Sequence, residues 1–236
     1  DDPVVVDRLR RFAYSAEHLR LHIPYNPYCQ VCKRAKCKNK YSKSSSFSRE
    51  ASERGDHLPR DHVETDKESV GVGNMKEALS IRDMYSGLRH MFPMERKDTG
   101  STADAILRFT GTQRAVGKRW SDNAGEIISA CKKLGISHDG RQPGVPKTNA
   151  LIERTNQTVV QQTKTLLLQA GLPPCFWPYA CQCFCFLSNV CGDIGTSPWF
   201  KTHGSEFEGE TFPFGCKVRF KPNTTSKWGR LGKFES

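Results

Sequence analysis

The stretch from residue 149 to residue 170 places the firmest constraint on how this chain folds. The side chains of one face recur at the 3.6-residue period of an α-helix, at Ile152, Val159, Val160, Thr163, Leu166, Leu167 and Ala170. Gly171 and Pro173 follow, and a glycine with a proline shortly after it is typical of a helix end. We therefore predict a long amphipathic helix that buries one face in a core.

Shorter patterns predict the elements around this helix. The strand patterns cover 57–64, 78–82, 88–92 and 115–120, and the other helical patterns cover 15–22, 101–111, 124–134 and 176–190. Strands first, and then strands that alternate with helices, are typical of a layered α/β domain with a mixed sheet. We predict four parts: a small module over 1–37, a basic linker over 38–56, a core over 57–190, and a truncated C-terminal extension over 191–236.

The charge of the chain favours a polyanionic partner. Thirty-six Lys and Arg residues stand against 25 Asp and Glu residues, which gives a net charge of +11, and nucleic acid is the most common partner of such a chain. No apolar run approaches the ~18 residues of a membrane span, and the N-terminus has no basic-then-apolar leader. We therefore expect neither a membrane protein nor a secretory signal, and we expect the ten cysteines to be reduced thiols or metal ligands.

A candidate zinc site lies near the N-terminus. His18 and His22 are four residues apart and share one helical face, and Cys29 and Cys32 form a Cys-x-x-Cys pair. Two imidazoles and two thiolates complete a tetrahedral structural zinc site, which would help so short a segment to fold. Cys37 is an alternative ligand, and a pair of reduced thiols in a basic loop is the alternative without metal.

Three carboxylates lie where an α/β sheet commonly binds ligands. Asp122 follows a predicted strand and precedes a helix, Glu153 lies in the first turns of the long helix opposite its apolar face, and Asp61 lies within the first strand. Oxygen ligands of this kind suit Mg²⁺. An alternative role for Asp122 is a helix N-cap, and the rivals of Asp61 for the first position are Asp56, Asp66 and Asp83.

Three motifs in order give the chain a specific resemblance. The segments SDNAGE (121–126), PGVPKTNALIERTNQT (143–158) and QAGLPPCFWPYA (169–180) resemble the integrase core of copia-type long-terminal-repeat retrotransposons. A conserved pattern of that family is matched by Pro143, Pro146, Asn149, Glu153 and Arg154. The likeness extends to 22–36 near the start and to Asn189, 197–199 and 213–216 near the end, so that it spans most of residues 17–222.

The resemblance implies both a fold and an activity. It implies a ribonuclease H-like α/β core with a mixed central sheet flanked by helices, preceded by a zinc module of the His-His-Cys-Cys type. It assigns Asp61, Asp122 and Glu153 as catalytic acids that hold Mg²⁺ or Mn²⁺. The implied reaction is DNA integration, by processing of a DNA 3′ end and transfer of that strand into target DNA. The family further implies a homo-multimer that acts in the nucleus, or in a cytoplasmic virus-like particle before nuclear entry.

Polar and basic residues near the predicted acids are candidates for DNA contacts. Some lie on or just before the long helix near Glu153, and the others form a cationic tether after the cysteines, where binding would be electrostatic and sensitive to salt. The set is Asn149, Arg154, Gln157, Gln161, Lys164, Lys33, Arg34, Lys36 and Lys38.

Two residues beside Asp61 argue for other functions. Strand alternation directs Arg60 to the face opposite Asp61, which should be buried under helices, and Pro59 removes a donor from a predicted interior strand. One alternative is therefore a catalytically inactive relic that still binds nucleic acid, and another is a nuclease of the same fold that cuts without joining. We interpret Cys181, Cys183 and Cys185 as core residues of an apolar helix and not as a metal site.

Overall fold

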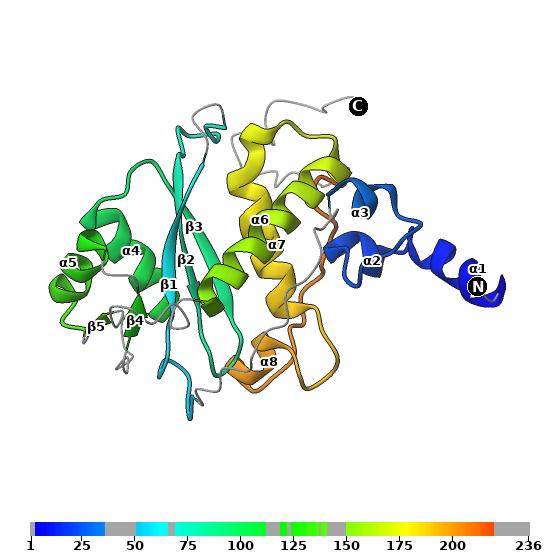
Figure 1. Ribbon diagram of the computed structural model, residues 1–236. Helices are drawn as coiled ribbons and strands as arrows, with labels where there is room; N and C mark the ends of the chain where they lie inside the picture. The colour runs from blue at the N-terminus through cyan, green and yellow to red at the C-terminus, as the bar shows by residue number, and fades with distance from the viewer. Residues whose placement is uncertain are drawn as a thin grey trace, which may run out of the picture.

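The computed structural model describes residues 3–35, 51–65, 69–111, 119–121, 124–136, 138–140 and 150–219. A central sheet lies between two helical layers, and a small helical module packs on the outer side of one layer (Figure 1). This arrangement confirms the predicted ribonuclease H-like fold class.

The sheet is mixed, as predicted. Its order is β3-β2-β1-β4-β5, with β1 antiparallel to β2, β2 antiparallel to β3, and β1, β4 and β5 parallel to one another. The strands are β1 (Arg60–Glu64), β2 (Glu77–Arg82), β3 (Arg89–Met94), β4 (Arg119–Ser121) and β5 (His138–Gly140).

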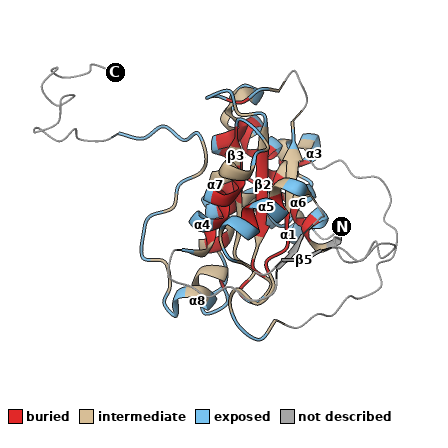
Figure 2. Cartoon of the chain, turned by 90° about the vertical axis from the view of Figure 1, so that its left-hand side faces the viewer, coloured by how far each residue is buried: buried red, intermediate tan, exposed pale blue. Residues whose placement is uncertain are grey.

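Both faces of the sheet are buried because side chains of a strand alternate between them. On β2, Leu79 and Ile81 pack with α4 (Thr99–Thr110) and α5 (Gly125–Lys133). Ala78 faces the other way, into a cluster with residues of α6 (Ala150–Ala170) and α7 (Trp177–Val190). The buried residues therefore form two layers, one on each side of the strands. Figure 2 shows buried positions on the strands and on the helices that pack against them.

The predicted long helix is confirmed as α6. It ends at Ala170, where Gly171 takes a positive φ of 65° and the Leu172 amide donates to the Leu167 carbonyl oxygen at 3.1 Å. A glycine that turns the chain in this way satisfies the last carbonyls of a helix.

The start of the first strand differs from the prediction. β1 begins at Arg60 and not at residue 57, so Pro59 precedes the ladder and its missing N–H costs no strand hydrogen bond. The Pro59 carbonyl oxygen still accepts from the Arg82 amide at 3.1 Å. The concern that Pro59 breaks an interior strand was therefore wrong. The predicted strand over 115–120 corresponds in part to β4, and residues 112–118 lie outside the described residues.

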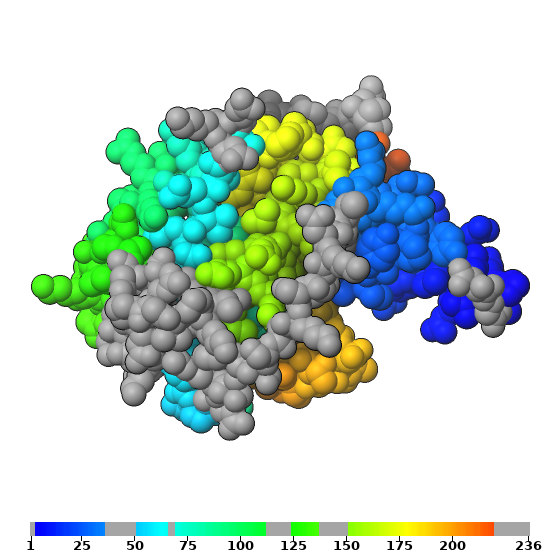
Figure 3. Space-filling model, in the orientation of Figure 1, coloured from blue at the N-terminus to red at the C-terminus, as the bar shows by residue number. Residues whose placement is uncertain are grey.

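The N-terminal module consists of short helices, two of which the patterns did not predict. The helices are α1 (Pro3–Phe12), α2 (Ala16–Leu21) and α3 (Gln30–Ala35), and the patterns predicted only α2. Both α2 and α3 contact α6, and the space-filling view shows the module seated directly against the core (Figure 3). The short elements η2 (Pro174–Phe176) and α8 (Pro198–His203) flank α7.

A bilayer-spanning helix is not found in the part of the chain that the structure describes: no helix there combines the necessary length with the necessary hydropathy.

Arg60 lies in the apolar layer under α5, as the alternation of β1 predicts. Its side chain is only 1% exposed, and Nη2 donates to Cys131 Sγ at 2.9 Å. Burial lowers the pKa of Arg60, and the nearby Cys131 thiol acts in the opposite direction. The ion pairs found among the described residues join Arg11 to Asp7 and Lys97 to Glu64, so none of them compensates this guanidinium.

We expect Arg60→Met to stabilise the protein, because a linear apolar side chain fills the same space without a buried charge. The free energy of unfolding should rise by about 1–3 kcal/mol in urea denaturation. Cys131→Ala, which removes the acceptor and keeps the charge, should lower it by about 1–3 kcal/mol. A loss of stability in Arg60→Met would show that the guanidinium stabilises the fold.

Candidate metal centres and nucleic-acid face

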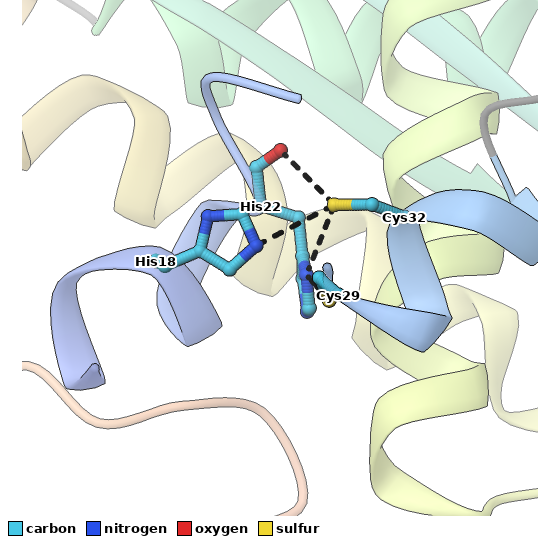
Figure 4. A group of neighbouring side chains, drawn as sticks. All are labelled: His18, His22, Cys29 and Cys32. Carbon is cyan, nitrogen blue, oxygen red and sulfur yellow. Dashed lines mark hydrogen bonds between the residues drawn. The ribbon is translucent and has the colours of Figure 1, made fainter. Parts of the chain in front are cut away.

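The four predicted zinc ligands converge in the N-terminal module. Ser15 caps α2, with its hydroxyl oxygen accepting from the His18 amide at 3.2 Å, and His22 ends the helix in a left-handed conformation with φ 54°. Cys29 immediately precedes α3 and Cys32 lies within it. The two imidazoles and the two thiols therefore come from adjacent helix ends that face one another (Figure 4).

A buried turn sets the distance between the two pairs. Asn26 is fully buried, its amide donates to the Leu9 carbonyl oxygen at 2.8 Å, and its side-chain oxygen accepts from the Tyr28 amide at 2.9 Å. This Asx turn leads directly into Cys29. The six residues between His22 and Cys29 are therefore enough to bring the thiols back to the histidines.

The distances within this cluster fit a tetrahedral zinc ion. Cys32 Sγ lies 3.4 Å from His18 Nε2 and 3.7 Å from His22 Nδ1, and Cys29 Sγ lies 3.5 Å from His22 Nδ1. Bonds of about 2.1 Å to nitrogen and about 2.3 Å to sulfur at tetrahedral angles require a separation of about 3.6 Å. All four ligand atoms lie within 4.8 Å of one another, and all four residues are buried. The alternative ligand Cys37 lies outside the described residues.

The module is attached to the core mainly along α6. His22 Nε2 and Gln169 Oε1 are 2.8 Å apart, and Gln161 Nε2 donates to the Ala35 carbonyl oxygen at the end of α3 at 3.4 Å. On another side, Arg20 of α2 donates to Thr211 Oγ1 at 2.7 Å. Helix α6 is therefore part of the core and also forms the surface on which the module sits.

The other end of α6 meets β1 at one of the predicted catalytic acids. Asn156 Nδ2 donates to Asp61 Oδ2 at 3.1 Å, and Glu153, exposed to solvent, precedes Asn156 by three residues on the helix. Side chains three apart on a helix are neighbours. Glu153 thus lies on α6 within one turn of Asn156, the residue that contacts the Asp61 carboxylate. Sequence reasoning missed Asn156, although its place one turn after Glu153 was a usable signal.

Asp122 lies outside the described residues. The nearest described pairing is that of Ser121 with Arg60, where β4 runs parallel to β1. Asp122 and Asp61 are the residues that follow these two in the sequence.

The rivals of Asp61 have local structural roles. Asp56 accepts from the Ser52 hydroxyl at 2.5 Å, and its hydrogen bonds with Ser52 and the Glu53 amide lower its pKa. Asp83 is fully buried and accepts from the Ser86 hydroxyl and from the Gly55 amide. These bonds hold loops in place. Asp66 lies outside the described residues.

Several of the predicted DNA contacts are exposed on α6 and on the adjoining α3. Arg154, Gln157 and Lys164 are exposed on α6, and Lys33 and Arg34 are exposed on α3, which packs against that helix. Gln161 differs, because it is half-buried and its side-chain amide donates to the Ala35 carbonyl oxygen. Asn149, Lys36 and Lys38 lie outside the described residues.

Two of the three α7 cysteines lie in the core, as interpreted from the sequence, whereas Cys183 is only half-buried and lies outside the core cluster. Cys181 and Cys185 are buried in the cluster between α6, α7 and the sheet. Burial raises the pKa of Cys185 to about 12 and that of Cys181 well above its ordinary value, so both thiols stay protonated at neutral pH.

The comparison with known sequences points to transposon polyproteins. Over 83 residues, 33% of this chain, the sequence is 39% identical to the "Retrovirus-related Pol polyprotein from transposon TNT 1-94" of Nicotiana tabacum. Over 125 residues, 49% of this chain, it is 36% identical to the "Retrovirus-related Pol polyprotein from transposon RE1" of Arabidopsis thaliana. The chain is a homologue of retrotransposon Pol polyproteins. No protein-family model matches it.

These Pol polyproteins are far longer than this chain. The matched segments cover 6% of the tobacco relative and 8% of the Arabidopsis relative. The similarity therefore concerns a short segment of each polyprotein, and the activity of this chain has to be argued from its structure.

A solved structure shares the fold. A chain of the simian T-cell lymphotropic virus intasome, solved in complex with PP2A regulatory subunit B56 gamma, superimposes with a TM-score of 0.54 and 19% sequence identity. The match covers 84% of this chain and 69% of that one. The Pol homologue therefore has a fold that also occurs in a retroviral intasome.

Proposed function

We propose that this chain is the integrase region of a retrotransposon polyprotein and that it processes DNA 3′ ends and joins them to target DNA. The observation that carries the proposal is the contact of α6 with β1, where Asn156 donates to Asp61 at 3.1 Å one turn from Glu153. This contact joins the central strand that bears Asp61 to the turn of α6 that follows Glu153. The transposon homology supports the same assignment.

In this proposal Asp61, Asp122 and Glu153 hold Mg²⁺ or Mn²⁺, and the carboxylate oxygens suit these cations. When bound, such ions activate an attacking oxygen and stabilise the leaving oxygen at phosphorus. Asn156 restrains the Asp61 carboxylate through the hydrogen bond that it donates to Oδ2. The assignment of Asp122 is supported by the pairing of the neighbouring strands. Ser121 of β4 pairs with Arg60 of β1, and Asp122 and Asp61 are the next residues of the two segments.

The exposed face of α6 and α3 is proposed to bind the DNA backbone. Arg154 and Lys164 flank Gln157 on α6, and Lys33 and Arg34 extend the positive charge onto the module. Lys36, Lys38 and Asn149 remain candidates from the sequence. Contacts of this kind neutralise phosphates and weaken steeply as salt rises.

Assembly, location and domain boundaries are proposed on the same basis. One solved structure that shares this fold is of an intasome, and we propose a homo-multimer on DNA that acts in the nucleus after a stage in a virus-like particle. Residues 1–37 would form the zinc module, 38–56 a linker, 57–190 the catalytic core and 191–236 an extension.

Arg60 supports a second candidate function. Its charge is buried next to Asp61 without a carboxylate partner among the described residues, a cost that selection for activity would not favour. A catalytically inactive protein that binds nucleic acid through the same exposed face would tolerate it.

A strand-transfer assay distinguishes an active integrase from an inactive protein that only binds nucleic acid. The purified chain, given Mn²⁺, a labelled DNA end and a target plasmid, should produce joined products. Asp61→Asn and Glu153→Gln should abolish joining and keep DNA affinity within about threefold, because these changes leave the basic residues in place. Glu208→Gln, an exposed acid far from α6 in sequence, is the matched control and should join normally.

Other outcomes of this assay select other functions. DNA binding without cutting or joining by the unaltered chain would favour the inactive relic. Cutting without joining would favour the nuclease.

We propose further that His18, His22, Cys29 and Cys32 hold a structural Zn²⁺. All four ligand atoms face one another and the ligand set is closed, which suits a structural ion that cross-links α2 to α3.

One zinc per chain should therefore copurify with the protein. Cys32→Ser should lose it, and α1 to α3 should become sensitive to protease because so small a module depends on its metal. Cys216→Ser, which alters an exposed cysteine outside the cluster, is the control and should keep one equivalent. Equal zinc content in both variants would contradict the assignment.

A further inference from the structure

Helix α6 presents a second face to the N-terminal module. Gln161, Thr165 and Gln169 recur every four residues and therefore lie on one side of the helix. Thr165 is fully buried, Gln161 donates to the Ala35 carbonyl oxygen, and Gln169 reaches His22. Polar side chains of the core thus extend to the edge of the candidate zinc site.

The orientation of His22 makes the contact with Gln169 specific. His22 Nδ1 faces the thiols, at 3.5 Å from Cys29 Sγ and 3.7 Å from Cys32 Sγ, whereas Nε2 lies 2.8 Å from Gln169 Oε1. A histidine that binds metal through Nδ1 carries its proton on Nε2. That N–H then donates to the Gln169 carbonyl oxygen, which selects the tautomer that zinc requires.

We propose that Gln169, a residue of the core, is a positioning residue of the zinc site, and that zinc binding is thereby coupled to docking of the module on α6. The inference rests on zinc binding by His18, His22, Cys29 and Cys32, as proposed above. Gln169 fixes the ring of His22 in the docked arrangement, so docking raises zinc affinity. By thermodynamic reciprocity, zinc must strengthen docking by the same factor.

A second contact between module and core provides a control. Arg20 donates to Thr211 Oγ1 at 2.7 Å, and neither residue belongs to the cluster of candidate ligands. Thr211→Val keeps the shape of the side chain and removes this acceptor. It therefore removes a single docking contact, keeps the contacts of the module with α6 and so keeps the module docked, and does not touch the environment of His22.

Zinc affinity, measured by competition with a chromophoric chelator, tests the proposal on the full chain. Gln169→Met removes the acceptor and keeps the length of the side chain, and should weaken zinc binding about 10- to 100-fold. Gln169→Glu offers a stronger acceptor to the Nε2–H and should bind zinc at least as tightly as the unaltered protein. Thr211→Val should change the affinity less than threefold.

Each other result overturns the proposal. Unchanged affinity in Gln169→Met, or an equal loss in Gln169→Met and Thr211→Val, would leave Gln169 with a packing role only. If Gln169→Met does not fold, the Glu variant decides: its Co²⁺-substituted form should show a shifted absorption spectrum, and an unchanged spectrum would exclude a contact that tunes His22. Absence of zinc binding by the folded, unaltered chain would overturn the zinc site itself, and this measurement separates the two failures.

Discussion

The packing of α6 against two partners at once is the constraint on which the rest of the structure depends. One side of the helix buries Val159 and Leu166 against the sheet and α7. A second side contacts α2 and α3 of the module. Because a helix of this length is rigid, residues at its two ends keep a fixed separation. The Glu153 end is thereby held at β1, and the Gln169 end is held at the histidines.

In our account this arrangement connects two chemically different candidate centres through one helix. Near the N-terminal end of α6, carboxylates and an amide offer hard oxygen ligands, and near its C-terminal end imidazoles and thiols offer ligands typical of zinc. Exposed basic residues lie on α6 and on the neighbouring α3. In our account, the zinc module therefore serves the DNA-binding face because it holds α3 against the helix that bears Glu153.

The sequence predicted those features that rest on strong periodicity or on local chemistry. The 3.6-residue period located α6, and the spacing of His18 with His22 and of Cys29 with Cys32 located four residues that the structure brings together. Features that depend on long-range packing were missed. Periodicity assigned α6 one buried face, yet Thr165 is also buried, because a module distant in sequence covers it. The place of Asn156 one turn after Glu153 marks it as a neighbour of the predicted site, but its bond to Asp61 joins residues 95 apart, and no local pattern predicts that partner.

Anomalous diffraction from crystals grown with Mn²⁺ and a DNA end would test the central claim most directly. Our account predicts a manganese peak within coordinating distance of both the Asp61 and the Glu153 carboxylates, and its loss from crystals of Glu153→Gln. A complex in which DNA is bound, but in which manganese avoids Asp61 and Glu153, would contradict the claim that β1 and α6 together form a catalytic metal site.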